Sequence, residues 1–352
     1  MVYVAVRRAY LRDRVAAVSN RTAEVVNGEP LTVLDHGRRF LQVRTAKNET
    51  GWIEDHLVID EKTYDAFKRL AADNTKDPIT ATAVLNDELY MHVAPGRDTD
   101  HFYLLPANTK VTLLIRAAVP KSGLPPASLA KLAQPAQDAN KPASAHSPAS
   151  PQSAPPPPME DWWLVRDAKG DTGWMLASRL YVDVPDAIAE YGEGQNFVGA
   201  WQIATVNDPQ SNAPNHEVPE YLTVMAPPQS GLPYDFNQVR IFTWSRNHHR
   251  YETGFRLHPI EGYLPVKIFT AAGPKGFGQV PAFSFLLGSN GNVKVDPETG
   301  ITRPVNPRTI EYELVDTQAK RIGPDMAPIE TRHGEAKTDA KKPRHTASRK
   351  HR

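Results

Sequence analysis

The chain has 352 residues, which at about 150 residues per domain corresponds to two or three folded units. It contains no cysteine, which excludes disulfide bonds, thiolate metal sites and a cysteine nucleophile. No run approaches the ~18 consecutive apolar residues of a transmembrane helix, so we expect no transmembrane segment. The net charge is only +1. The excess of Lys and Arg lies in residues 331–352, a tail that contains no aromatic residue, so we expect no nucleic-acid partner.

The first half of the chain contains an internal repeat. Residues 40–53 (FLQVRTAKNETGWI) and 162–175 (WWLVRDAKGDTGWM) are identical at seven of fourteen positions, with a constant offset of 122. In both copies an alternating apolar run predicts a strand, a polar cluster predicts a turn, and Gly-Trp begins the returning strand. Gly51 and Gly173 allow close approach of a neighbouring strand, and we expect Trp52 and Trp174 to fill a very small core.

Each copy extends into a small antiparallel barrel of about five short strands, over residues 1–60 and 80–184. Tyr10 and Tyr90 hold equivalent places early in the two copies. Between the copies lies a linker, residues 61–79, in which apolar residues at helical spacing predict a short amphipathic helix over Glu61–Asp73 that packs on its barrel. The second copy also contains an insert, residues 117–161, with eleven prolines, and this composition predicts disorder.

The order of turn, strand, aromatic-x-x-Val-Arg, polar turn and Gly-Trp, followed by Leu57 or Leu180, resembles bacterial SH3-like domains. The resemblance implies two small SH3-like barrels that bind peptidoglycan or a protein partner of the cell envelope. The family's early Asn-Val-Arg-Ser-Gly-Pro motif is matched only loosely, by Tyr10–Arg12 and His92–Gly96. This departure from the family's motif weakens any carry-over of ligand contacts from the first strand.

The second half of the chain is predicted to be linker and loops over residues 185–235 and an antiparallel β domain over residues 236–322. The predicted strands are separated by turn residues and comprise Gln238–Ser245, Arg250–Leu257, Tyr263–Phe269, Ala282–Leu287, Val293–Val295 and Ile310–Val315. Their succession predicts a meander like one propeller blade or half of a sandwich. Residues 323–352 form a basic tail that we expect to be disordered. The predicted fold class is therefore all-β.

The candidate ligand-binding residues are aromatic, because flat apolar rings beside a polar rim bind extended peptides or sugars. They are Tyr10, Phe40, Tyr90, Trp162 and Trp163. Adjacent strand residues face opposite ways, so one ring of the Trp162–Trp163 pair should point outward unless another surface covers it.

Three histidines, His248, His249 and His258, invite a metal site. They flank a predicted hairpin without His-Glu-x-x-His spacing and without a nearby pair of carboxylates, which favours exposed loop histidines. We therefore predict no metal, no cofactor and no catalytic residue.

The favoured function is a non-catalytic binding or targeting protein of the bacterial cell envelope. The alternatives are a cell-wall hydrolase with an unrecognised C-terminal catalytic domain, and a protein scaffold that binds through sheet edges. Met1 is followed directly by a predicted strand, Val2–Val6. We expect a location in the periplasm or envelope, with a possible lipid anchor, if a signal sequence is missing before Met1, and in the cytoplasm if Met1 is the true start.

Overall fold

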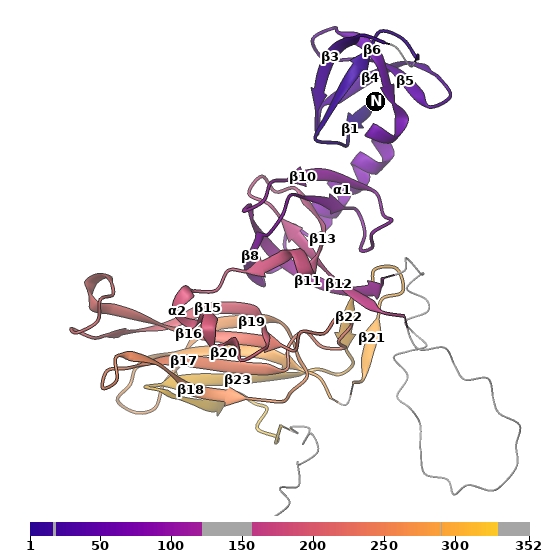
Figure 1. The fold of residues 1–352 in the computed structure, drawn as a ribbon. Helices are drawn as coiled ribbons and strands as arrows, with labels where there is room; N and C mark the ends of the chain where they lie inside the picture. The colour runs from indigo at the N-terminus through magenta and orange to yellow at the C-terminus, as the bar shows by residue number, and fades with distance from the viewer. Residues whose placement is uncertain (17–18, 122–156, 290, 330–352) are drawn as a thin grey trace, which may run out of the picture.

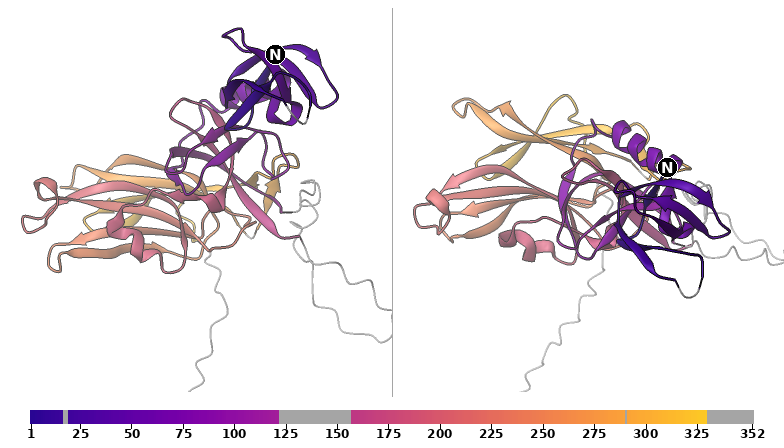
Figure 2. Two further views of the ribbon diagram at one scale, coloured as in Figure 1. Left: turned by 45° about the horizontal axis from the view of Figure 1, so that its top comes forward. Right: turned by 90° about the horizontal axis from the view of Figure 1, so that it is seen from above.

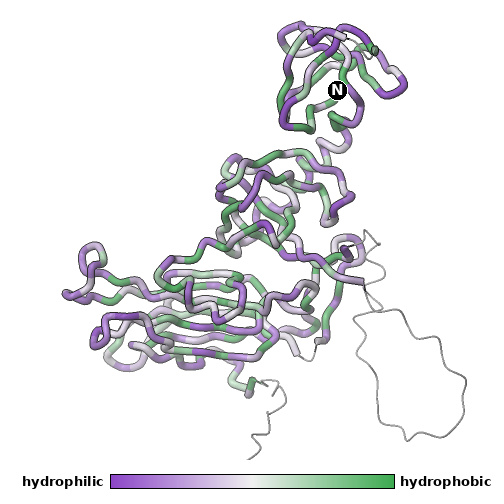
Figure 3. Tube along the Cα trace, viewed as in Figure 1, coloured by the Kyte–Doolittle hydropathy of each residue, from purple (hydrophilic) through white to green (hydrophobic). Residues whose placement is uncertain are grey.

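The computed structural model describes residues 1–16, 19–121, 157–289 and 291–329, and it is all-β with few helices (Figure 1). Three units follow one another along the chain: a first repeat (residues 1–60), a second repeat (residues 80–184) and a two-sheet sandwich (Figures 1 and 2). Hydrophobic and hydrophilic residues alternate along the chain in each unit (Figure 3), as half-buried strands require. No helix among the described residues is long and apolar enough to cross a membrane.

The two repeats have the same topology, with seven strands each. The first repeat contains β1 (Val2–Val4), β2 (Arg8–Arg12), β3 (Arg21–Val26), β4 (Pro30–His36), β5 (Phe40–Arg44), β6 (Thr50–Glu54) and β7 (Val58–Asp60). The second contains β8 (Ala81–Leu85), β9 (Leu89–His92), β10 (His101–Leu105), β11 (Lys110–Pro120), β12 (Met159–Arg166), β13 (Thr172–Leu176) and β14 (Leu180–Val182). The strand orders are β3-β2-β6-β5-β4-β1-β7 and β10-β9-β13-β12-β11-β8-β14, which coincide when seven is added to each number.

The correspondence between the repeats extends to the pairing of single residues. Val43 lies opposite Gly51 in the first repeat, and Val165 lies opposite Gly173 in the second. The register of the pairing between β4 and β5 shifts after Val33, and that between β11 and β12 shifts at the equivalent point, after Leu113. The prediction that one hairpin occurs twice is therefore confirmed.

The glycines of the two Gly-Trp motifs lie under a neighbouring strand. A Cβ atom on Gly51 would come within 2.8 Å of the Cβ of Leu11, and one on Gly173 within 2.5 Å of the Cβ of Met91. The prediction that the following tryptophans fill the cores is wrong for Trp52, which is partly exposed, whereas Trp174 is buried, but in a second cluster apart from the core beside Gly173. Side chains alternate along a strand, so the residue after each tryptophan, Ile53 or Met175, enters the core on the glycine's side, and the indole lies on the outer face.

Helix α1 (Glu61–Asp73) coincides with the predicted helix and lies between the two repeats. The Asp60 side chain caps it by accepting a hydrogen bond from the Thr63 backbone N–H. The Tyr64 ring stacks on Tyr3 of the first repeat, with ring centroids 3.8 Å apart. The buried ring of Phe67 packs against Phe102 of the second repeat. The helix therefore joins both repeats rather than covering only the first.

The insert is shorter than the predicted range, residues 117–161. Residues 117–120 and 159–161 belong to β11 and β12, which pair as far as Pro120 opposite Met159. The apolar side chains of Ala117, Ala118 and Val119 are buried there, and this burial offsets the cost of ordering the chain. Residues 122–156, which make up the rest of the insert, lie outside the described residues.

The sandwich consists of two four-stranded antiparallel sheets. The first contains β15 (Asn196–Asn207), β16 (Glu217–Ala226), β17 (Gln238–Ser245) and β18 (Arg250–Leu257) in that order. The second contains β19 (Gly262–Ala272), β20 (Gln279–Leu287), β23 (Arg308–Val315) and β24 (Gln318–Ile322) in that order. The sheets face each other, because the ring of Phe255 in β18 lies 4.9 Å from that of Tyr312 in β23. The structure is thus a whole sandwich rather than half of one.

The prediction of linker and loops over residues 185–235 is wrong for most of that segment. A short helix α2 (Asp186–Ala189) is followed by β15 and β16, which form the edge and the next strand of the first sheet. The register of this pair shifts twice, between Phe197 and Gly199 and between Gln202 and Ala204. Such bulges break the alternation by which a strand is identified in a sequence. The predicted Gln238–Ser245 and Arg250–Leu257, by contrast, coincide with β17 and β18.

The predicted disordered tail begins too early. Residues 323–329 are held against the sandwich, because Arg308 donates to both carboxylate oxygens of Asp325, at 2.8 and 2.7 Å, and to the carbonyl of Ala327. Residues 330–352 lie outside the described part of the chain.

The hydrophobic cores show how the units are joined. The first repeat has a core of its own, whereas one continuous core runs from the second repeat into the sandwich. A small two-stranded sheet, β21 (Val293–Val295) and β22 (Thr302–Pro304), reaches back from the sandwich to β11 through a bridge between Ile301 and Ala117. The second repeat is therefore fixed against the sandwich.

Replacing the close-packed glycine should destabilise the second repeat. In Gly173→Ala the new methyl group would overlap Met91 and crowd the carbonyl of His92, at 2.5 and 3.2 Å. We expect a loss of about 1–3 kcal/mol, measured as a lower midpoint of urea unfolding. The exposed Lys169→Ala in the adjacent turn should leave the midpoint unchanged, and equal midpoints for both variants would contradict the packing argument.

The second repeat should also lose stability in mild acid because of His92. Burial lowers the pKa of His92 to about 4, and the nearby His101 contributes to the shift. The unfolded chain takes up this proton near pH 6.5, so stability falls as the pH drops from about 6.5 to 4, by at most ~3 kcal/mol. Urea unfolding of His92→Gln at pH 7 and pH 4.5 should show a smaller drop than the parent, and an equal drop would refute the assignment.

Candidate functional site

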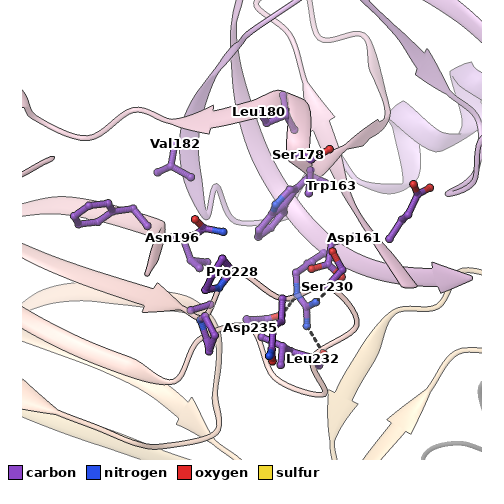
Figure 4. Close-up of a pocket in the computed structure, with 18 of the residues that line it drawn as sticks. Asp161, Trp163, Ser178, Leu180, Val182, Asn196, Pro228, Ser230, Leu232 and Asp235 are labelled. Atoms are coloured by element: carbon purple, nitrogen blue, oxygen red, sulfur yellow. Dashed lines mark hydrogen bonds and ion pairs between the residues drawn. The ribbon is translucent and has the colours of Figure 1, made fainter. Parts of the chain in front are cut away.

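A cleft lies where the second repeat meets the sandwich (Figure 4). Its volume is about 860 Å³. One wall is formed by β12, β14 and the turn between β13 and β14, and the other by the start of β15 and the loop that follows β16. Residues as far apart as Arg97 and Asp235 line it. This is a concave surface between two units, where ligand sites commonly occur.

The aromatic part of the cleft comes from both walls. Trp163 in β12 is 7% exposed and lies beside the cleft. Phe197 in β15 and Tyr234 in the loop after β16 belong to the opposite wall, and Tyr181 in β14, 61% exposed, completes the lining. Rings on facing walls can hold the apolar faces of a ligand between them.

A charged pair stands in the second repeat's wall. Arg97 donates to both carboxylate oxygens of Glu160, with contacts of 2.6, 2.9 and 3.0 Å. Glu160 is nearly buried, while the side chain of Arg97 is 54% exposed. This bidentate geometry holds a partly accessible cation in a fixed direction, which suits recognition of a carboxylate.

The base of the cleft is cross-linked by Arg116. From β11 its guanidinium donates to Asp161 of the neighbouring strand at 3.1 Å and to Asp235 of the sandwich at 3.0 Å. It also donates to the carbonyls of Leu232 and Tyr234, at 2.8 and 2.7 Å. The side chain is 8% exposed, so this network fixes the loop before β17 to the second repeat. A second cavity of about 380 Å³ lies on the other side of Arg116 and Asp235.

One polar atom in the cleft has no partner among the described residues. The side-chain oxygen of Gln195 is buried and accepts no hydrogen bond there. A buried acceptor without a donor is costly. Together with the neighbouring exposed Asn196, it provides amide groups for a ligand that carries N–H or O–H donors.

The five aromatic residues predicted to bind a ligand do not share one groove. Only Trp163 lines the cleft. Trp162 faces away from it and is 2% exposed, so the expected outward-pointing ring is covered, and its indole N–H has no partner among the described residues. Trp162 is followed outward by the rings of His92, His101 and Tyr90, with successive centroid distances of 5.0, 5.5 and 4.6 Å.

Tyr10 and Phe40 belong instead to the outer face of the first repeat. The guanidinium of Arg21 lies 4.0 Å above the Tyr10 ring, and Phe40 shares its face with Trp52. The side chains of Tyr10 and Phe40 are both partly exposed. The sequence prediction therefore identified residues from three separate surfaces.

The cleft residues that sequence reasoning missed are mostly polar and far apart in the chain. Arg97 and Glu160 are separated by 63 positions, and Arg116 and Asp235 by 119. Each is an ordinary charged residue in its own segment, with no local motif. Arg97, which follows β9, comes close to Glu160 because β9 and β12 both pair with β13. Arg116 comes close to Asp235 because the sandwich packs against the second repeat.

The histidines are less isolated than predicted. Nδ1 of His248 lies 2.7 Å from Glu252, and Nδ1 of His249 lies 2.8 Å from Asp208, so a carboxylate accompanies each. The Trp244 indole N–H lowers the pKa of Asp208 to about 2, with help from His249 and against the effect of burial. Within the described ranges, no three histidine or acidic residues are placed to hold a metal ion.

Removing the buried arginine should destabilise the junction far more than removing an exposed one. In Arg116→Met the carboxylates of Asp161 and Asp235 would remain in the junction without their cation, for which we expect a loss of about 3–5 kcal/mol. Arg179→Met removes a half-exposed pair with Asp87 and should cost at most ~1 kcal/mol. Thermal unfolding measures both, and similar losses for the two variants would argue against the cross-link.

Comparison with known proteins gives no family assignment. No family model matches the chain, and no curated protein matches it. Among solved structures it is similar to an NlpC/P60 family protein from Bacillus cereus, with 10% identity, 87% of this chain and 94% of that chain covered, and a TM-score of 0.22. It is also similar to NlpC2 from Trichomonas vaginalis, with 10% identity, coverage of 88% and 94%, and a TM-score of 0.17. Neither similarity is close enough to indicate a fold or a function.

Proposed function

We propose that this chain is a non-catalytic binding protein of the bacterial cell envelope that holds a fragment of peptidoglycan in the cleft between the second repeat and the sandwich. The observation that carries the proposal is the cleft of about 860 Å³, lined by aromatic, amide and charged side chains. The resemblance of the two repeats to bacterial SH3-like domains supports it, as does their common strand order.

The chemistry of the walls suits such a ligand. Sugar rings have apolar faces that stack on aromatic side chains such as Trp163 and Phe197. Peptide stems carry amides and carboxylates, which can bind the amides of Gln195 and Asn196 and the guanidinium of Arg97. The proposed location is the periplasm or the envelope, where this polymer occurs.

A specific observation favours a second candidate, a scaffold that binds through a sheet edge. Strand β19 is an edge strand of its sheet. Ile268 and Phe269, in its C-terminal half, are 39% and 37% exposed. Phe277, in the turn that follows, is 50% exposed. An exposed edge with apolar side chains can accept a strand from another protein.

Binding of the full chain to purified sacculi tests the peptidoglycan proposal and shows which of the two surfaces carries the binding. We expect the protein to sediment with sacculi, and Tyr181→Ala to weaken the binding several-fold because it removes the most exposed ring of the cleft. Phe277→Ala removes another exposed ring, at the edge of the sandwich, and serves as the matched control.

The two variants distinguish the outcomes. A larger loss with Phe277→Ala than with Tyr181→Ala would favour the sheet edge over the cleft. Absence of sedimentation at low salt would overturn peptidoglycan binding. Release of soluble muropeptides would overturn the non-catalytic part of the proposal.

A further inference from the structure

The outer face of the second repeat is covered by other parts of the chain. Leu114, Trp162, Leu164 and Trp174 form a buried cluster there, and each is at most 4% exposed. These four residues lie on the side of the sheet opposite to the core, since Trp162 and Leu164 alternate with the core residues Trp163 and Val165.

The cover on this face includes helix α1. Leu70 of the helix packs against the cluster, and Ile301 of the sandwich packs beside it. The Arg166 guanidinium donates a hydrogen bond to the carbonyl of Asn74, the residue that ends the helix. The last carbonyls of a helix have no partner within it, and a cation is favourable at this end. Arg166 therefore fixes the end of a helix whose apolar side chain covers the tryptophan face.

The first repeat has the same face without the cover. Strand pairing places Leu34, Phe40, Gln42 and Trp52 at the positions of Leu114, Trp162, Leu164 and Trp174. Leu34 is 45% exposed, whereas its counterpart Leu114 is 4% exposed. Phe40, Gln42 and Trp52 are all partly exposed.

The arginine of the repeated motif follows the same contrast. Arg44 occupies the position of Arg166, because each pairs with the threonine that precedes Gly-Trp. Arg44 is exposed, and its guanidinium has no hydrogen bond or ion pair among residues 1–16, 19–121, 157–289 and 291–329. The first repeat thus presents both elements that bind α1 in the second, an apolar face and an arginine beside it.

We propose that the outer face of the first repeat, made by Leu34, Phe40, Trp52 and Arg44, binds an amphipathic helix of a partner protein in the way that the second repeat binds α1. The apolar side chains of that helix lie on Leu34 and Trp52, and its final carbonyls accept hydrogen bonds from Arg44. Gln42 stands where the covered face has Leu164, so this face is more polar than its counterpart, as suits a partner that also dissociates. The proposal does not depend on the cleft or its ligand.

A synthetic peptide with the sequence of residues 61–76, which contains α1 and its last turn, is the probe. A fluorescently labelled form, stapled to keep it helical because short helices are marginal alone, is titrated into the full chain and followed by anisotropy. We expect saturable binding that Leu34→Ser and Arg44→Ala each weaken about tenfold, which corresponds to ~1.4 kcal/mol. A peptide carrying Leu70→Ser should bind correspondingly more weakly.

Two variants away from the face serve as controls. Val26→Ser removes a valine on β3 that is 49% exposed, and Lys294→Ala removes an exposed cation on β21. Both should bind the peptide like the parent. Binding that is insensitive to Leu34→Ser and Arg44→Ala would show that the peptide displaces α1 from the second repeat, and this result, or absence of saturation at millimolar peptide, would overturn the proposal.

Discussion

Both faces of strand β12 are buried, and the arrangement of the whole molecule depends on this constraint. Trp163 and Val165 on one face belong to the core that continues into the sandwich, while Trp162 and Leu164 on the other lie in the cluster that Leu70 of α1 helps to cover. A strand that is apolar on both sides must be covered on both sides. The second repeat consequently lies between a helix and a sandwich, and the cleft forms at the edge of the second contact.

The first repeat shows what the same hairpin does when only one face is covered. The identical residues of the two copies are those that determine the hairpin itself: the valine and glycine that pair, the turn, and the tryptophan on the outer face. On the outer face, Phe40 and Gln42 stand where the second repeat has Trp162 and Leu164. Two copies of one local structure thus have different surroundings because of packing between units, while the hairpin geometry is common to both.

The sequence predicted the elements whose signals are local. The repeated hairpin, α1, and strands β17 and β18 follow from alternation, helical spacing of apolar residues and turn residues. Strands β15 and β16 are hard to predict because bulges interrupt their alternation, and alternation along the strand, rather than residue size, puts the tryptophans on the face opposite to the core beside the glycine. The cleft was not predictable, because Arg97 with Glu160 and Arg116 with Asp235 are brought together by tertiary packing alone.

Strands β11 and β12 are paired up to the residues at which the segment connecting them begins and ends. Pro120 and Met159 are neighbours in the sheet, so the segment between them enters and leaves at one fixed place. The entropic cost of closing such a segment grows only with the logarithm of its length. Lengthening or shortening it, or placing another domain there, would therefore leave the positions of Trp163 and Arg116 unchanged, and this makes the hairpin end a natural attachment point for added sequence.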